Sequence, residues 1–368
     1  MSDHRLNLYR VAVSPRTTWW FIELHTPAGT GLGECSDAGT AAAVLDEVVR
    51  AADAVRGRDV LGERELVVSG LAARVGELHA ARAHTAATVL GGLEQALSDL
   101  AARHKGIPLW EWLGGRPQGP IPLYANINRM PGSRAPEAVA ASAADAAAQG
   151  FRAVKCAPFD VPDASLPLAD VGVARLRAAS AALPDGVELF ADFHERLTWQ
   201  EVESVLPCVE DAGVAWVEDV VPVDAVDRLR ELRDRMPAKV AGGEMIFHAA
   251  EAESAATATV LDVLMPDVKH AGGVTRAAGI AAAYPELLIS PHNPSGPVAT
   301  LAGAHLLSTA VRPGLLEYAH GEVPWRAEVL RGAERVEDGY LHLPDAPGLG
   351  ADLDTDHPSV QLVWSCPL

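Results

Sequence analysis

The sequence has few cysteines, no long hydrophobic run and little positive charge. Its 368 residues include four cysteines, none in a CxxC pair, so neither a zinc site nor a disulfide framework is predicted. No apolar run reaches the roughly 18 residues of a transmembrane helix, and the N-terminus lacks a signal-peptide core. The formal net charge is −19, from 30 Lys and Arg against 49 Asp and Glu. We therefore expect a cytoplasmic protein with no nucleic-acid and no membrane partner.

The remaining composition, 49% apolar and 21% charged residues, is that of a large globular protein. Alternating residues over 6–25 predict antiparallel strands, and helical spacing follows over residues 40–105. The segment Leu113-Gly-Gly-Arg-Pro117 breaks this pattern. We therefore predict three parts, namely an N-terminal α+β domain over 1–117, a second domain over 118–325, and a tail over 326–368 that returns to the first domain.

Short apolar segments alternate with alanine-rich helical segments in the second domain. The strand candidates are residues 121–125, 152–155, 187–192, 214–218, 239–244, 261–266, 287–291 and 314–317. Such alternation predicts an α/β fold with a parallel (β/α) barrel of the TIM type. A doubly wound open sheet is the alternative, but no GxGxxG follows the first strand and no P-loop occurs.

Three carboxylates end successive hydrophobic segments at an even interval of 26 residues. They are Asp192, Glu218 and Glu244. Because parallel strands of a barrel end at one rim, these side chains should converge there, and oxygen ligands with open positions suit Mg²⁺. We predict that the three residues bind Mg²⁺. The alternative is that each pairs with a nearby Lys or Arg.

Ionisable side chains also end the neighbouring strands. Lys155 precedes the three carboxylates, and Asp267, His292 and Glu317 follow them at similar intervals. Seven consecutive strand ends thus present an ionisable group toward one rim. Such a pattern is hard to explain as a solvated surface and indicates an active site.

Several motifs resemble those of the enolase superfamily, in its mandelate racemase-like branch, over almost the full length. They are Gly31-Leu-Gly-Glu34, Gln95-Ala-Leu-Ser-Asp-Leu-Ala101, Leu113-Gly-Gly115, Asp192-Phe-His194-Glu-Arg196, Pro266-Asp267-Val-Lys-His-Ala-Gly-Gly273 and Pro291-His292-Asn-Pro-Ser-Gly-Pro297. The last three are most similar to acid-sugar dehydratases of the galactonate type. The resemblance implies a modified (β/α)7β barrel, an α+β capping domain built from the N-terminus and the C-terminal tail, and a homo-oligomer.

The same resemblance implies proton abstraction next to a carboxylate, with Mg²⁺ stabilising a dianionic ene-diolate, a known pattern of this superfamily. His292 is the predicted general base, because an imidazole titrates near neutral pH, and Asp267 would orient it. Glu317 would donate a hydrogen bond to the ene-diolate if burial near carboxylates keeps it protonated. The alternative for His292 is a histidine at the rim that is bonded to a backbone carbonyl. The alternative for Glu317 is a structural salt bridge.

His194 and Lys155 decide the direction of the predicted reaction. In the resembled dehydratases a histidine at the place of His194 is the general acid for the departing hydroxyl, and strand alternation would put it beside Asp192. Support of the metal site is its alternative role. Relatives with a second base carry Lys-x-Lys, whereas this chain has Lys155-Cys156-Ala157. The missing lysine favours dehydration over racemisation, which needs two bases.

The sequence thus predicts a Mg²⁺-dependent dehydratase of a sugar acid that forms a 2-keto-3-deoxy acid. Lys155, Asn126, Asn128, Arg129 and Trp20 are the candidate substrate contacts. A racemase or epimerase is the first alternative, since a desolvated Lys155 would be a second base. A non-catalytic metal-binding barrel is the second.

Overall fold

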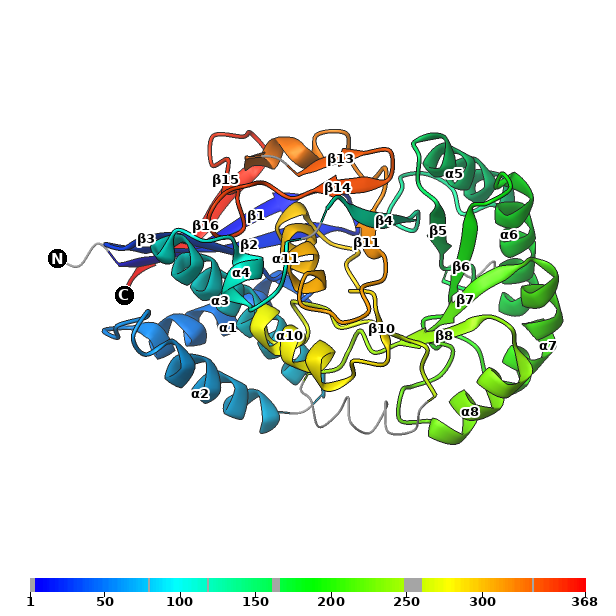
Figure 1. Cartoon of the computed structure of the whole chain (residues 1–368), viewed down its shortest axis with the longest axis horizontal. Coiled ribbons are helices and arrows are strands. Elements are labelled where there is room, and N and C mark those ends of the chain that lie inside the picture. The colour runs from blue at the N-terminus through cyan, green and yellow to red at the C-terminus, as the bar shows by residue number, and fades with distance from the viewer. Residues whose placement is uncertain (1–3, 79, 118, 161–165, 248–259, 333) are drawn as a thin grey trace.

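A parallel β-barrel and an antiparallel α+β domain make up the described part of the chain (Figure 1). The computed structural model describes residues 4–78, 80–117, 119–160, 166–247, 260–332 and 334–368. No helix within these ranges is long and apolar enough to cross a membrane.

The barrel has eight parallel strands arranged as β11-β4-β5-β6-β7-β8-β9-β10. Their bounds are β4 Ile121–Asn126, β5 Ala153–Cys156, β6 Glu188–Asp192, β7 Val214–Glu218, β8 Lys239–Gly242, β9 Val263–Leu264, β10 Leu288–Ile289 and β11 Leu316–Ala319. A parallel bridge between Ile289 and Pro313 closes the ring, and the Gly314 amide donates to the Ile289 carbonyl at 2.7 Å. The predicted barrel is therefore confirmed, and the open sheet is excluded.

Helices on the outside connect these strands (Figure 1). They are α5 Pro136–Ala148, α6 Leu168–Ala182, α7 Trp199–Asp211, α8 Val226–Arg235, α10 Val274–Ala283 and α11 Pro297–Leu307. Helix α7 shows why they begin where they do, since Thr198 and Glu201 form a capping box that satisfies free amides of the first turn. Most of the segment between β8 and β9, residues 248–259, lies outside the described residues.

Aromatic side chains fill the interior of the barrel. Phe190 and Trp216 stack with their ring centroids 3.7 Å apart, and Tyr124 packs edge-on against Trp216 at 5.3 Å. These rings form a cluster of their own with Ala153 and Met265. The barrel is therefore a packed core, and polar chemistry is confined to its C-terminal rim.

The N-terminal domain is an antiparallel sheet covered by helices. Its elements are β1 Arg5–Ala12, β2 Thr18–Thr26, β3 Gly29–Glu34, α1 Ala41–Val55, α2 Arg64–Gly76, α3 Ala80–Lys105 and α4 Leu109–Trp112. Helix α3 packs directly on β3 because Gly31 and Gly33 have no side chain. A Cβ added at either position would lie 2.0 Å from a carbonyl oxygen of α3, that of Ala96 or Gly92.

The C-terminal tail divides between the two parts. After the 3-10 helix η1 Arg326–Val329, its strands are β12 Leu330–Arg331, β13 Arg335–Glu337, β14 Tyr340–His342, β15 Asp352–Leu353 and β16 Val360–Pro367. Strand β14 pairs with β4 of the barrel, whereas β16 pairs with β1 in the sheet β16-β1-β2-β3. The final strand thus brings the tail to the N-terminal domain.

Candidate active site

Three carboxylates lie at the C-terminal ends of adjacent barrel strands. Asp192 ends β6, Glu218 ends β7, and Glu244 follows β8 by two residues. Each has one buried oxygen (Asp192 Oδ2, Glu218 Oε2 and Glu244 Oε2) that accepts no hydrogen bond of regular geometry from the described residues, although a histidine Nε2 lies 2.8 Å from the first and from the third. Three largely buried carboxylates that converge at one rim carry more negative charge than their neighbours neutralise without a cation, and buried charges are normally paired. The all-oxygen donor set is the type that Mg²⁺ prefers.

Lys155 lies among these carboxylates with 1% of its side chain exposed. Its Nζ is 3.4 Å from Asp192 Oδ2 and 2.9 Å from Glu317 Oε1, and it forms an ion pair with Glu218. Burial lowers the pKa of Lys155, but the attraction of Glu218 and Glu317 is stronger and raises it well above the ordinary value. The side chain is therefore a charged donor.

His292 follows β10 and is held from two sides. Its Nδ1 lies 2.8 Å from Asp267 Oδ2, and its Nε2 lies 2.8 Å from Glu244 Oε2. Burial lowers the pKa of this imidazole, but the charge of Glu244, then that of Glu317 and the hydrogen bond to Asp267, raise it well above 6.5. The Asp267–His292 geometry is that of an imidazole oriented by a carboxylate, with Nε2 directed to the rim.

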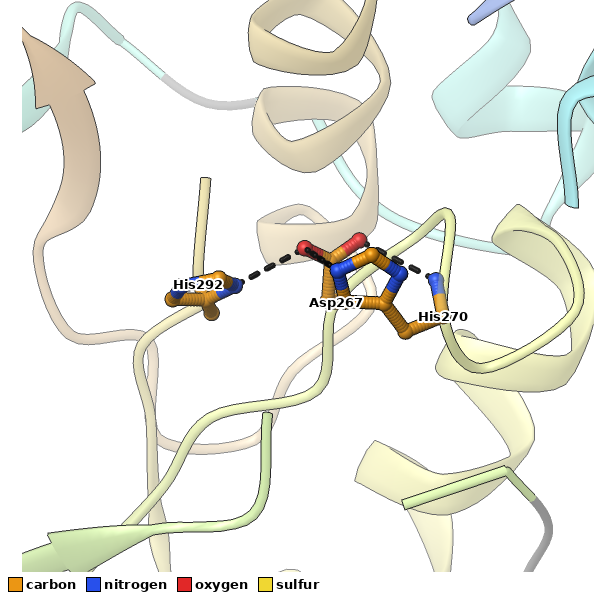
Figure 2. A group of neighbouring side chains, drawn as sticks. All are labelled: Asp267, His270 and His292. Carbon is orange, nitrogen blue, oxygen red and sulfur yellow. Dashed lines mark hydrogen bonds and ion pairs between the residues drawn. The ribbon is translucent and has the colours of Figure 1, made fainter. Parts of the chain in front are cut away.

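Asp267, His270 and His292 form a second cluster of potential ligands, whose atoms lie within 4.8 Å of one another. Figure 2 shows the Asp267 carboxylate between the two histidine side chains. The Lys269 ammonium already binds Asp267 Oδ2 at 2.7 Å, and the Lys269 amide binds Oδ1 at 2.6 Å. Because that ammonium repels a second cation, this geometry favours orientation of His292 over metal binding.

His194 lies beside Asp192 for a different reason from the predicted one. Strand β6 ends at Asp192, and His194 and Glu195 have φ angles of 46° and 54°. A left-handed turn, rather than strand alternation, therefore brings His194 Nε2 to 2.8 Å from Asp192 Oδ2. Burial lowers the pKa of His194, but Asp192 and the hydrogen bond to Asp160 raise it to about 11.

Asp160 is a site residue that the sequence analysis missed. Its Oδ1 lies 2.5 Å from His194 Nδ1, and it follows β5 by four residues. The only signal in the sequence is an acidic residue in the loop after that strand.

Glu317 has different neighbours from those expected. Asn126 Nδ2 and Lys155 Nζ donate to its Oε1 at 2.6 and 2.9 Å, and the Asn293 amide donates to its Oε2 at 2.9 Å. Burial raises the pKa of Glu317, but Lys155 and then His292 lower it below the ordinary value. The carboxylate is surrounded by donors and cations, which favour its ionised form. Its role toward a substrate stays a prediction.

A cavity of about 720 Å³ lies over this rim. Among its lining residues are Ser14, Thr17, Asn126, Asn128, Arg129, Lys155, Asp192, His194, Glu244 and His292. The predicted contacts on β4 and in the following loop thus reach the cavity. Asn128 Oδ1 also accepts from the Ala157 amide at 2.6 Å, so the position of the missing lysine lies directly behind a residue of the wall.

The expectation for Trp20 is wrong. Trp20 is 6% exposed and packs in the core of the N-terminal domain with Leu6, Leu8 and Ile22. It is absent from the cavity lining. The reason is its position on β2, an inner strand of the sheet, where the side chain faces the covering helices.

The fold and this rim define a class of protein, namely a (β/α)-barrel enzyme with a cavity between the barrel and an α+β capping domain. The chain belongs to the enolase superfamily, because residues 138–357 match the family model described as enolase C-terminal domain-like. The family predicted from the sequence is confirmed.

Named relatives cover most of the chain. A D-galactonate dehydratase of Ralstonia nicotianae is 29% identical over 96% of this chain and 92% of that protein. A D-gluconate dehydratase of Thermoproteus tenax is 30% identical over 73% of this chain and 55% of that protein. A solved mandelate racemase/muconate lactonizing enzyme from Jannaschia sp. CCS1 is similar at a TM-score of 0.82, with 26% identity and 95% coverage of both chains.

Proposed function

We propose that the protein is a sugar-acid dehydratase, a carbon–oxygen hydro-lyase that removes the C2 proton, expels the C3 hydroxyl as water and forms a 2-keto-3-deoxy acid. One observation carries the proposal. Two imidazoles line the cavity, each bonded through Nδ1 to an aspartate and each facing a predicted metal ligand through Nε2. The names of the relatives, dehydratases of D-galactonate and D-gluconate, support the substrate class.

The proposed cofactor is Mg²⁺, held by Asp192, Glu218 and Glu244. When bound, Mg²⁺ would supply positive charge that neutralises the substrate carboxylate as the C2 proton leaves. The convergence of three largely buried carboxylates at adjacent strand ends, with Glu218 Oε2 left without a partner among the described residues, supports this assignment. The charged Lys155 would bind the substrate carboxylate or a hydroxyl from the other side.

The two histidines divide the proton transfers. His292 takes the C2 proton at Nε2, while Asp267 holds Nδ1 and stabilises the imidazolium. His194 gives the proton on its Nε2 to the departing C3 hydroxyl, while Asp160 holds its Nδ1. Glu317 keeps Lys155 and Asn126 in place. One base and one acid suffice for elimination.

Turnover in D₂O with Mg²⁺ tests the proposal. D-galactonate, D-gluconate and D-xylonate are incubated with the protein, and 2-keto acid is measured beside the configuration and deuterium content of recovered substrate. We expect 2-keto acid from at least one of them. Deuterium at C2 with inverted configuration and no keto acid would establish an epimerase instead.

A metal-loaded protein that turns over none of these acids would favour the non-catalytic barrel.

A cytoplasmic homo-oligomer is part of the proposal, and light scattering of the purified protein tests the assembly.

A further inference from the structure

Two arginines line the same cavity outside the catalytic cluster. Arg134 is half-buried in the loop between β4 and α5, and Arg16 is exposed in the turn between β1 and β2 of the capping domain. Neither side chain forms an ion pair within the described part of the chain. Because the protein has a formal net charge of −19, two arginines without carboxylate partners at one cavity require an explanation.

The guanidinium of Arg134 contacts only neutral groups. Its NH2 donates to Asn128 Oδ1 at 3.1 Å and its NH1 donates to the Ile127 carbonyl at 3.4 Å, while its Nε donates to no described residue. Burial lowers the pKa of Arg134, the charge of Asp160 only partly offsets this, and the charge of Arg16 lowers the pKa further. The two guanidinium groups are thus close enough to repel each other, and an oxyanion bound to both would remove that repulsion.

Two other carboxylates of the cavity lining have partners of their own. Asp160 Oδ1 lies 2.5 Å from His194 Nδ1, and Asp37 Oδ1 accepts from Arg129 NH2 at 3.0 Å. These acidic groups therefore do not neutralise the two unpaired arginines.

The backbone at both arginines is held by buried side chains. Arg175 of α6, which is 5% exposed, donates to the Arg134 carbonyl at 2.7 Å. Thr17, the residue after Arg16, is 3% exposed and accepts from Arg129 NH1 at 3.2 Å, which ties the turn of the capping domain to the barrel. Both positions are therefore part of the folded wall of the cavity.

Arg134 lies on the outer part of this wall. Its partner Asn128 accepts from the Ala157 amide at 2.6 Å, and Ala157 follows Lys155 by two residues. Lys155 in turn contacts the proposed metal ligand Asp192 at 3.4 Å. Asn128 thus separates the arginine from the metal-binding rim, so Arg134 is placed for the end of a substrate that is remote from the reacting carboxylate.

We propose that Arg134 and Arg16 bind a second oxyanion at the distal end of the substrate, so that the protein prefers dianionic sugar acids to monoanionic ones such as D-galactonate. This inference rests on the proposed function, which places the reacting carboxylate at the metal-binding rim. A guanidinium presents paired N–H donors that match the oxygens of a carboxylate or a phosphate. A terminal carboxylate and a terminal phosphate ester share this chemistry, and the experiment distinguishes them.

The test measures the affinity of the Mg²⁺-loaded protein for five acids by calorimetry, in a His292→Asn background for any acid that is turned over. The monoanions are D-galactonate and D-gluconate, and the dianions are galactarate, D-glucarate and 6-phospho-D-gluconate. We expect at least one dianion to bind roughly 10-fold more tightly than the monoanion of the same configuration, the strength of a charge-assisted hydrogen bond. Whether a diacid or the phosphate ester is preferred identifies the oxyanion. Arg16→Gln and Arg134→Gln should each remove most of this preference.

Arg152→Gln is the matched control. Arg152 is an exposed arginine directly before β5, at the end of the barrel opposite the rim. The substitution removes the same charge and should leave the preference for the dianion unchanged. An equal loss of preference in this variant would show an effect of net charge alone and would overturn the inference.

Binding and turnover together separate this inference from the proposed function. If a dianion is preferred, the preference depends on both arginines and no 2-keto acid is formed, the inference stands and the dehydratase proposal fails. Turnover of D-gluconate or D-galactonate without a preference for any dianion overturns the inference and leaves the dehydratase proposal intact. Equal weakening of all five acids in Arg16→Gln and Arg134→Gln would indicate a structural role and would also overturn the inference, as would a failure of the wild type to bind any of them.

Discussion

His194 and Asp160 form a close pair at the mouth of the barrel, with Nδ1 and Oδ1 2.5 Å apart. The histidine follows the third barrel strand, and the aspartate lies in the loop after the second. The same relation joins His292 to Asp267 at 2.8 Å. Each imidazole therefore has a fixed ring orientation, and its Nε2 is the atom available for proton transfer.

Asp160→Asn should slow elimination by roughly 10- to 100-fold in kcat, with little change in KM, because the carboxylate orients His194 and stabilises its protonated form. Steady-state kinetics across pH measures both effects. The plot of kcat against pH should move along the pH axis, and kcat should be lower throughout. Asp145→Asn is a matched control, since Asp145 binds His320 at 2.9 Å at the edge of the barrel. If both variants behave alike, Asp160 has no part in the reaction.

His194→Asn should reduce elimination far more than exchange of the C2 proton, because the base that removes this proton remains in place. Proton NMR of the substrate in D₂O measures exchange, and keto-acid formation measures elimination. Equal losses of the two rates would assign His194 to support of the metal site instead.

His292→Asn should lower both rates by roughly 10²- to 10⁴-fold, the usual contribution of a general base. Mg²⁺ affinity should stay nearly intact, because the imidazole contacts Glu244 without being a predicted ligand. Calorimetric titration of the metal checks this. Retained exchange at C2 would remove His292 as the base.

Glu218→Gln should weaken Mg²⁺ binding at least 10-fold, since an amide oxygen replaces a charged ligand. Isothermal titration with MgCl₂ gives the affinity directly. Asp262→Asn is the control, because Asp262 accepts from the Val240 amide at 2.9 Å at the opposite end of the barrel. An unchanged titration of the Glu218 variant would refute its role as a ligand.

The strand ends could be predicted from the sequence because a barrel repeats one unit. Asp192, Glu218 and Glu244 occur at the same phase of that unit, so the period alone places them at one rim. Asp160 lies in a loop, where no period exists and only the folded chain shows what the residue contacts. It was not predicted.

The surroundings of Glu317 and Trp20 could not be predicted, because they depend on neighbours from elsewhere in the chain. Glu317 was expected to be surrounded by carboxylates, yet Lys155, from β5, and the Asn293 amide lie against it. Trp20 was expected at the cavity, but the pairing of β2 between β1 and β3 places it in the core. Such contacts between distant segments are tertiary, and local sequence patterns do not encode them.

His305 should make the protein sensitive to acid. It is fully buried in α11, where Nδ1 accepts from the Trp110 amide at 3.1 Å and Nε2 donates to the Leu349 carbonyl at 3.4 Å. Burial lowers its pKa to about 4, against about 6.5 in an unfolded chain. Below pH 6.5 the unfolded state therefore binds a proton that the folded state does not.

The stabilising effect of neutral His305 is thus fully present above about pH 6.5 and is lost as the pH falls toward 4, by on the order of 3 kcal/mol. Urea unfolding at pH 7.5 and 4.5 should show a smaller decrease for His305→Gln than for the wild type. His25→Gln is the control of opposite sign, because the hydrogen bond to Glu23 raises the pKa of His25. The stabilising effect of protonated His25 is present at low pH and is lost as the pH rises. An identical decrease in the wild type and His305→Gln would show that another buried group controls acid unfolding.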